Sequence, residues 1–178
     1  MMKKMLIPIA LTAACVLHAE TFRIEGEDLA VTQGKVQIGK HALAFSGGKS
    51  VTVTAKETTL EGACKLEKAG KYQVWIRTFT QGGKWRNGEL SINGQSLGKF
   101  GDEALKEGEK AHWGWIKLKE AELPAGKIEF KIFSKMGYVR VDAILLTDDE
   151  SYTPPEKAAD IVKVPALKPY QEAAAPKE

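Results

Sequence analysis

The sequence is poor in cysteine. Only Cys15 and Cys64 occur among its 178 residues, and Cys15 lies in a segment that we expect to be processed. Cys64 alone cannot form an internal disulfide, so the fold must be held by its apolar core, with or without the help of a metal ion. The apolar neighbours of Cys64 predict that it is a small buried side chain.

Long apolar runs are also absent. The longest, residues 5–17, is too short to span a membrane, which predicts no transmembrane segment. Because it follows Lys3 and Lys4, it predicts a secretory signal over residues 1–19 and an exported protein, periplasmic or extracellular. An alternative stays open: Thr-Ala-Ala-Cys at residues 12–15 loosely resembles a bacterial lipoprotein signal, which would attach a lipid anchor at Cys15.

Neither sign of charge dominates. The formal net charge is +3, and without Lys3 and Lys4 the mature chain has 24 basic against 23 acidic residues, or about +1. A net charge this small does not predict the basic surface that binds nucleic acid, so no nucleic-acid partner is expected.

Motifs of catalysis are missing as well. The sequence contains no Gly-x-Ser-x-Gly elbow, no phosphate-binding loop and no Cys-His pairing. Its carboxylates are numerous, so counting alone does not exclude a glycosidase pair. The sequence therefore favours binding over catalysis, and we expect that the protein is not an enzyme.

What the sequence does contain is period-two alternation. Tyr72, Val74 and Ile76 alternate with polar or larger residues, and a second run over residues 127–132 repeats the pattern; both follow an Ala-Gly-Lys turn. This predicts an all-β protein, an antiparallel β-sandwich of about eight to ten strands with little helix. The side chains expected in its core are Tyr72, Val74, Ile76, Ile128, Phe130, Ile132, Val141 and Leu145.

The same patterns set the predicted boundaries. A first strand is expected over residues 22–27, a hairpin turn at Asn93-Gly94, and a last strand over residues 138–147 that is apolar on both faces from Ala143 and hence covered. The sandwich domain is predicted over residues 20–150. The remaining residues, 151–178, are rich in Pro, Ala and Lys, which suits an extended tail or linker, part of which could pack on the domain.

Four motifs together resemble a known family. They are Glu-Gly-Glu at residues 25–27, Ala-Gly-Lys-Tyr-Gln-Val-Trp-Ile-Arg at 69–77, Leu-Pro-Ala-Gly-Lys at 123–127 and Val-Asp-Ala-Ile-Leu-Leu-Thr at 141–147. In this order and spacing, over roughly residues 21–153, they resemble carbohydrate-binding modules of the family 6 and family 35 type. The resemblance implies a galactose-binding-domain-like β-sandwich, or jelly roll.

The resemblance also implies a structural calcium ion. Its positions in this sequence are Glu25, Glu27 and Asp142, with backbone carbonyls from the region of residues 44–49. The donor types are suitable, because calcium takes six to eight hard oxygen ligands. Asp142 interrupts an apolar strand, where an unpaired carboxylate would be costly. A salt bridge from Asp142 to Arg23, Arg140 or a lysine is the alternative.

For a sugar ligand, the first candidate is Trp85. It lies in a polar, glycine-rich loop beside Arg86 and Asn87, so its indole could face a sugar ring while these neighbours bond to hydroxyls. The alternative is that Trp85 folds back and caps the core.

Other aromatic residues are secondary candidates. Trp113 and Trp115 share one face of a predicted strand over residues 112–119, either as core side chains or as a sugar platform, and Tyr138 is a further candidate. Trp75 and Arg77 lie opposite the core face of their strand; Arg77 and Arg140 could bind a uronate carboxylate or form ion pairs within the fold.

The sequence thus predicts an exported, non-catalytic carbohydrate-binding module whose partner is a polysaccharide or glycan, with the sugar stacked on Trp85. The alternative is a structural or protein-interaction β-sandwich without a sugar site.

Overall fold

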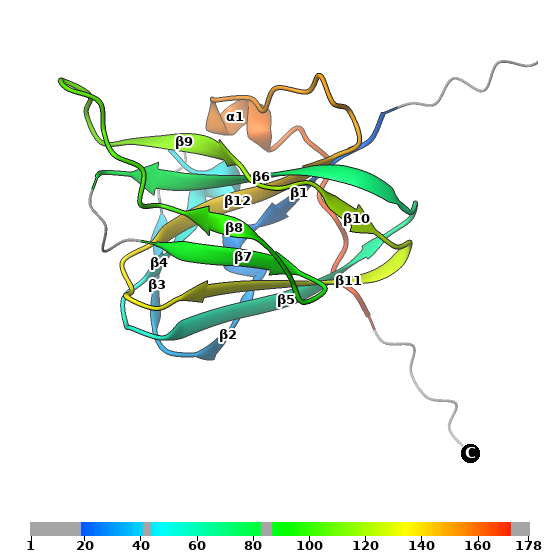
Figure 1. The fold of residues 1–178 in the computed structure, drawn as a ribbon, viewed down its shortest axis with the longest axis horizontal. Helices are drawn as coiled ribbons and strands as arrows, with labels where there is room; N and C mark the ends of the chain where they lie inside the picture. Colours follow the sequence, from blue (N-terminus) through cyan, green and yellow to red (C-terminus); the bar gives the residue numbers. More distant parts are fainter. Residues whose placement is uncertain (1–18, 41–43, 83–86, 172–178) are drawn as a thin grey trace, which may run out of the picture.

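The structure is a computed structural model that describes residues 19–40, 44–82 and 87–171. The predicted signal and Cys15 lie outside these residues. The described chain forms an antiparallel β-sandwich of two packed sheets, with very little helix, as predicted (Figure 1). No helix in the described ranges is long and apolar enough to cross a membrane.

The first sheet has seven strands in the order β10-β6-β12-β4-β3, with β9 also paired to β6 and β1 also paired to β12. Its strands are β1 (Thr21–Glu25), β3 (Val36–Lys40), β4 (Lys49–Val53), β6 (Gly70–Thr80), β9 (His112–Lys117), β10 (Ala121–Leu123) and β12 (Arg140–Thr147).

The second sheet has five strands in the order β2-β5-β11-β7-β8. Its strands are β2 (Ala30–Gln33), β5 (Thr58–Leu66), β7 (Gly88–Ile92), β8 (Gln95–Phe100) and β11 (Gly126–Ser134). The described residues therefore hold twelve strands rather than eight to ten. The count is higher because single long strands pair with two short ones: β9 and β10 share β6, and β1 and β4 share β12.

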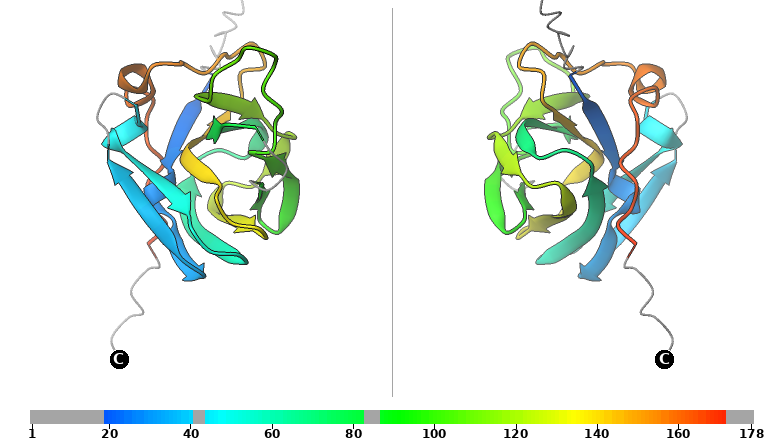
Figure 2. Two further views of the ribbon diagram at one scale, coloured as in Figure 1. Left: turned by 90° about the vertical axis from the view of Figure 1, so that its left-hand side faces the viewer. Right: turned by 90° about the vertical axis from the view of Figure 1, so that its right-hand side faces the viewer.

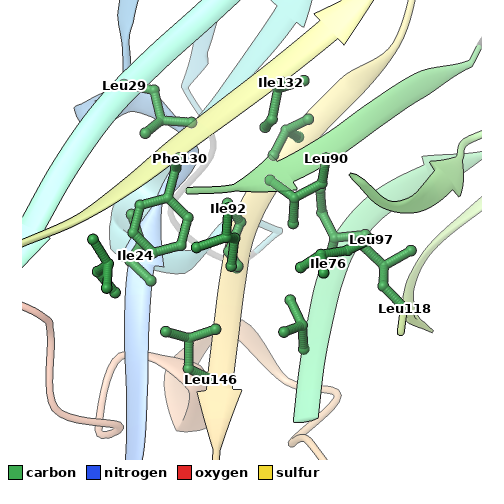
Figure 3. Packing of buried hydrophobic residues seen from close by; sticks show 14 of the residues in the cluster. Ile24, Leu29, Ile76, Leu90, Ile92, Leu97, Leu118, Phe130, Ile132 and Leu146 are labelled. Carbon is green, nitrogen blue, oxygen red and sulfur yellow. The ribbon is translucent and has the colours of Figure 1, made fainter. Parts of the chain in front are cut away.

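The core lies between the two sheets. The alternating residues Tyr72, Val74 and Ile76 of β6 are fully buried there, and so are their counterparts on β11. Figure 3 shows side chains from both sheets, among them Phe130, Ile92 and Leu146, meeting in this layer. All eight predicted core residues are buried, although Leu145 does not belong to this cluster.

The first strand is shorter than predicted. It ends at Glu25, and a 3-10 turn, η1 (Gly26–Asp28), follows. Gly26 passes close to β12, because a Cβ on it would lie 3.0 Å from the carbonyl oxygen of Val141. A strand over residues 22–27, as the sequence predicts, would place Glu25 and Glu27 on one face; the turn at Gly26 means that they do not share a strand face.

Residues 151–171 belong to the segment predicted as a tail of which part could pack on the domain, and they do pack on it. We call residues 151–171 the C-terminal strap. It contains one helical turn, α1 (Ala158–Ile161), and then runs down beside β1 (Figure 2). The Arg23 N–H donates to the Pro165 carbonyl at 2.8 Å, and the Leu167 N–H donates to the Arg23 carbonyl at 2.8 Å.

Further along, the strap pairs with the second sheet. The Lys65 N–H donates to the Lys168 carbonyl at 3.0 Å, and the Tyr170 N–H donates to the Ala63 carbonyl at 2.8 Å. Extended, proline-rich chain is suited to this role, since the edges of β1 and β5 supply the partners that its backbone needs. Cys64, beside this contact, is buried as predicted, and burial raises the pKa of its thiol to about 11.

The strap also explains why β12 is apolar on both faces. Ile144 and Leu146 belong to the core between the sheets, whereas Ala143 and Leu145 alternate with them and are equally buried. The strap lies over that opposite face of the seven-stranded sheet, with α1 on the side away from the second sheet (Figure 1). The prediction that the last strand is covered on both faces is thus confirmed.

Candidate binding cleft

A cleft of about 530 Å³ lies between the outer face of the seven-stranded sheet and the C-terminal strap. Strands β6 and β9 form its floor, and the start of the strap forms one side. Its lining residues are Trp75, Arg77, His112, Trp113, Gly114, Trp115, Thr153, Pro154, Glu156 and Lys157.

Strand register places the three tryptophans together. In the antiparallel pair of β6 and β9, Arg77 lies opposite Trp115, and Trp75 lies opposite Lys117. Residues that are directly opposite in a ladder point to the same face. Trp113 and Trp115 therefore share a face, as the alternation predicted, and this face also carries Trp75. All three indoles are only partly buried.

Neighbouring rings and a cation fix the orientation of Trp113. Phe45 meets its ring edge-on at 5.2 Å between centroids, and Phe79 packs against it at 5.4 Å. The Arg77 guanidinium lies 5.6 Å from the ring centroid. Trp113 is thus supported by side chains of its own sheet face instead of being part of the main core, and it still lines the cleft.

The indole N–H groups differ in their partners. The Trp115 Nε1–H donates to the Pro155 carbonyl at 2.8 Å. The Trp75 Nε1 is buried and has no hydrogen-bond partner among the described residues. A buried donor without a partner costs about 1–3 kcal/mol.

Arg77 connects the cleft floor to three other segments. Its Nη1 pairs with the Asp142 carboxylate and donates to the Ala44 carbonyl at 2.9 Å, and its Nη2 donates to the Glu156 carbonyl of the strap at 3.3 Å. The side chain is 5% exposed. Of the two roles considered for Arg77, the structure shows the ion pair within the fold.

Asp142 is fully buried and has its charge compensated. Besides Arg77, it accepts the Ser46 N–H at 2.9 Å. Burial raises the pKa of the Asp142 carboxyl, although the hydrogen bond and charge of Arg77 act against this. The salt bridge predicted as the alternative to metal binding is present, but its partner is Arg77 and not Arg23, Arg140 or a lysine.

The other two predicted metal ligands lie close to this pair. Glu25 Oε1 pairs with Arg23 and accepts the Ser46 hydroxyl at 2.9 Å. The Oε2 atoms of Glu25 and Glu27 are buried, and neither has a hydrogen-bond partner in the part of the chain that the structure describes. Burial, together with the charges of neighbouring carboxylates, raises the pKa of Glu27.

The side chains of both glutamates lie close to Gly47. A Cβ on Gly47 would lie 3.2 Å from Glu25 Oε1 and 3.5 Å from Glu27 Oε1. Glu25 and Glu27 fit a hard cation, because Oε2 of each is a carboxylate oxygen without a partner among the described residues. Asp142 is committed to Arg77. Within the described ranges, no three His, Cys, Asp or Glu side chains form a group that could hold a metal ion.

Two of the residues predicted to bind sugar, Asn87 and Tyr138, lie apart from the cleft lining. Trp85 and Arg86 fall outside the described residues. The Asn87 carbonyl accepts the Ser134 hydroxyl at 2.9 Å, and Asn87 borders a different, smaller cleft of about 180 Å³. Tyr138 is 60% exposed with a φ of +63°. The predicted sugar-binding residues that line the large cleft are Trp75, Arg77, Trp113 and Trp115, whereas Asn87, Tyr138 and Arg140 do not line it.

Residues of the strap were missed by the sequence analysis. Thr153, Pro154, Glu156 and Lys157 were assigned to a tail because their composition carries no periodic signal. One indirect signal was available, since a strand that is apolar on both faces requires a cover over each. Nothing in the sequence said which segment supplies it.

The comparisons with known proteins agree with this fold. The sequence matches no protein-family model and no curated protein. Among solved structures, one similar chain is the C-terminal CBM6 of the laminarinase LamC from Zobellia galactanivorans, at 17% identity and a TM-score of 0.54. The alignment covers 72% of this chain and 100% of that module.

Two further solved structures are similar. The CBM35 of Paenibacillus barcinonensis is 19% identical with a TM-score of 0.57, covering 71% of this chain and 98% of that one. A carbohydrate-binding module of Cellvibrio mixtus lichenase 5A, solved with cellotriose, is 19% identical with a TM-score of 0.51, covering 72% and 97%. Other matching chains are whole enzymes, of which this chain covers 29%. The chain thus has the β-sandwich fold of the CBM6 and CBM35 modules.

Proposed function

We propose that this protein binds carbohydrate without cleaving it and holds a glycan in the cleft between β9 and the C-terminal strap. The observation that carries the proposal is the gathering of Trp75, Trp113 and Trp115, all partly exposed, in one cleft. Indole rings offer flat apolar faces to the C–H faces of sugar rings. A volume of about 530 Å³ lies within the usual range of ligand sites.

Polar groups around the indoles suit sugar hydroxyls. The polar residues Thr153, Glu156 and Lys157 line the same cleft. The lichenase module was solved with cellotriose, which supports neutral β-linked glucans as the first ligands to test. We expect weak binding, with a Kd on the order of micromolar to millimolar.

The carboxylates of the cleft favour binding over hydrolysis. Glycoside hydrolysis usually requires two carboxyl groups that flank the scissile bond. Among the residues that line the cleft in the described chain, Glu156 has the one free carboxyl group, since Asp142 lies beneath and pairs with Arg77. This supports the interpretation of the protein as a binding module.

We also propose a structural calcium ion held by Glu25 and Glu27. The support is that Oε2 of each residue is buried without a partner among the described residues. Calcium would neutralise the two carboxylates and tie η1 to the loop at Gly47. Asp142 is not a calcium ligand in this proposal, because the positive charge beside it comes from Arg77 and not from the ion.

Export and the Trp85 platform remain parts of the proposal that rest on the sequence. Mass spectrometry of the exported protein should find a chain beginning near Glu20. A chain that retains Met1 would contradict export, whereas a diacylated Cys15 would establish the lipoprotein alternative.

The function is tested with a glycan array followed by calorimetric titration of the strongest oligosaccharide. Trp113→Ala should weaken binding by at least about tenfold, since a stacking face is lost. Tyr138→Ala, an exposed aromatic outside the cleft, is the matched control and should bind like the parent.

Trp85→Ala distinguishes the two platforms. If it abolishes binding while Trp113→Ala has no effect, the sugar binds at the loop end. If the parent binds no glycan on the array, the carbohydrate proposal fails and the structural or protein-interaction role takes its place.

A further inference from the structure

We infer that the C-terminal strap is a working part of the binding cleft: it converts an open tryptophan platform into a preformed cleft that accepts one soluble glycan chain. The inference rests on the proposed carbohydrate function and goes beyond it. It assigns a binding role to residues 153–157 and states that the strap must be docked for the protein to bind glycan with its full affinity.

The first observation is that the strap is attached to the cleft floor itself. Two floor side chains donate to strap carbonyls: Trp115 Nε1 to Pro155, and Arg77 Nη2 to Glu156. The same floor residues line the cleft. The position of the side wall and the orientation of the floor are therefore fixed together, so a change in strap docking must change the cleft.

The second observation is that the strap is held independently of any ligand. Ile161 and Ala158 are buried, and the underlying Leu145 is fully buried on the outer sheet face. Residues 165–170 also make backbone hydrogen bonds to β1 and β5. Undocking would expose this apolar surface to water, which is unfavourable. The wall therefore exists before the ligand arrives, and binding does not have to order it.

The third observation concerns the length of the shared fold. The CBM6 of LamC is matched over its full length by 72% of this chain. The remaining residues of this chain therefore have no counterpart in the LamC module. The sandwich strands span residues 21–147, which are 127 residues or 71% of this chain. Because the strands alone account for about the matched length, we take the strap to be an addition to the shared sandwich.

The added wall decides what kind of carbohydrate fits. Three indoles on a bare sheet face would form an open platform, suited to the flat surface of an insoluble polysaccharide. With Thr153, Glu156 and Lys157 facing that floor, a ligand is contacted from two sides. A single chain can be surrounded in this way, whereas the face of a packed polysaccharide particle cannot enter.

The test uses two neighbouring residues of the strap. Ile161 is fully buried and Val162 is 42% exposed, so Ile161→Asp should undock the strap while Val162→Asp should not. Both are titrated with the strongest soluble oligosaccharide of the array. We expect Ile161→Asp to raise the Kd by about tenfold or more and Val162→Asp to leave it within about twofold of the parent.

Two measurements keep the result interpretable. Far-ultraviolet circular dichroism reports whether Ile161→Asp retains the sandwich. If it does not, hydrogen exchange of the parent with and without oligosaccharide decides instead. The amides of residues 161–164 bond within the strap, and their exchange should slow several-fold when glycan binds, because bound ligand stabilises the docked strap.

The outcomes separate the two proposals. If the parent binds no array glycan, the carbohydrate function itself fails, and this inference with it. If the parent binds and a folded Ile161→Asp binds equally well, or if strap amides exchange at the same rate with and without glycan, the strap has no part in binding and only this inference fails.

Discussion

The two faces of the seven-stranded sheet are built from the same strands but contact different groups. On the inner face, Tyr72, Val74 and Ile76 meet apolar side chains of the second sheet, and every one is fully buried. On the outer face of the same strand, Arg77 meets the Trp113 ring, the Asp142 carboxylate and a carbonyl of the strap, and Trp75 lines the cleft.

The difference shows how one strand can serve both stability and binding. Because side chains alternate with period two, β6 can present an aliphatic core face and an aromatic, charged face without any change of backbone. The inner face is closed by another sheet, which leaves no room for a ligand. The outer face is closed by a single irregular chain, which leaves a cleft beside it.

The largest effect is expected from a cavity in the core against which the inner face packs. Phe130→Ala, on β11 of the second sheet, should lower the free energy of unfolding by about 3–5 kcal/mol, through lost burial and a cavity. Urea denaturation followed by tryptophan fluorescence measures it. Tyr138→Ala, at an exposed position, should change stability by no more than about 0.5 kcal/mol. A mild Phe130→Ala would mean that the two sheets can collapse to fill the space.

A comparable loss is expected from the outer face, for an electrostatic reason. Arg77→Met leaves Asp142 buried without its partner, which typically costs about 3–5 kcal/mol. Arg140→Met is the control, because the side chain of Arg140 stacks on Phe79 and the loss of this contact should cost about 1 kcal/mol or less.

The pH dependence of Arg77→Met follows from the same pair. Burial raises the pKa of Asp142, and the charge and hydrogen bond of Arg77 oppose this. Removing Arg77 should therefore raise that pKa further. The folded state then holds a proton that the unfolded state loses above its ordinary pKa, so the stability of the variant should fall as pH rises from that value. A variant whose stability loss is the same at low and neutral pH would show that the charge of Asp142 is not its cause.

Calcium should have an intermediate effect. At a hundredfold excess over its Kd, it would add about 2.7 kcal/mol, or roughly 5–11 °C in melting temperature. Melts in calcium and in chelator measure this, and Glu27→Gln should remove most of the difference. Identical midpoints for metal-free and calcium-loaded parent protein would rule the ion out.

Glu27 also gives a prediction for the metal-free protein. Its pKa is raised in the fold, so the folded state binds the proton more tightly than the unfolded state. Stability should therefore decrease as pH rises through the interval above the ordinary glutamate pKa, and Glu27→Gln should flatten that slope. A slope unchanged in Glu27→Gln would assign it to another group.

The smallest effect tests one hydrogen bond of the outer face. Trp75→Phe keeps an aromatic ring but removes the N–H that is unpaired among the described residues. If a sugar oxygen accepts from this group, binding should weaken by roughly 3- to 30-fold, while stability in the absence of sugar changes little. Equal affinity for parent and variant would show that no sugar oxygen accepts a hydrogen bond from the Trp75 N–H.

The sequence by itself determined what depends on neighbours along the chain. Alternation in β6 and β11 predicted strands and core residues correctly, and Asn93-Gly94 predicted the hairpin between β7 and β8, where both residues have positive φ. The shared face of Trp113 and Trp115 followed from the same period. Strand periodicity is a local property, so local sequence suffices to read it.

Only the tertiary structure decided how distant segments meet. Nothing in the spacing of Arg77 and Asp142 indicated that they pair across β6 and β12. The composition after residue 151 also did not indicate that this segment forms one side of the cleft. The physical reason is that such contacts are selected by burial and hydrogen-bond satisfaction across the whole fold. Extended, proline-containing chain has the same local signature whether it is free in water or held against two sheet edges.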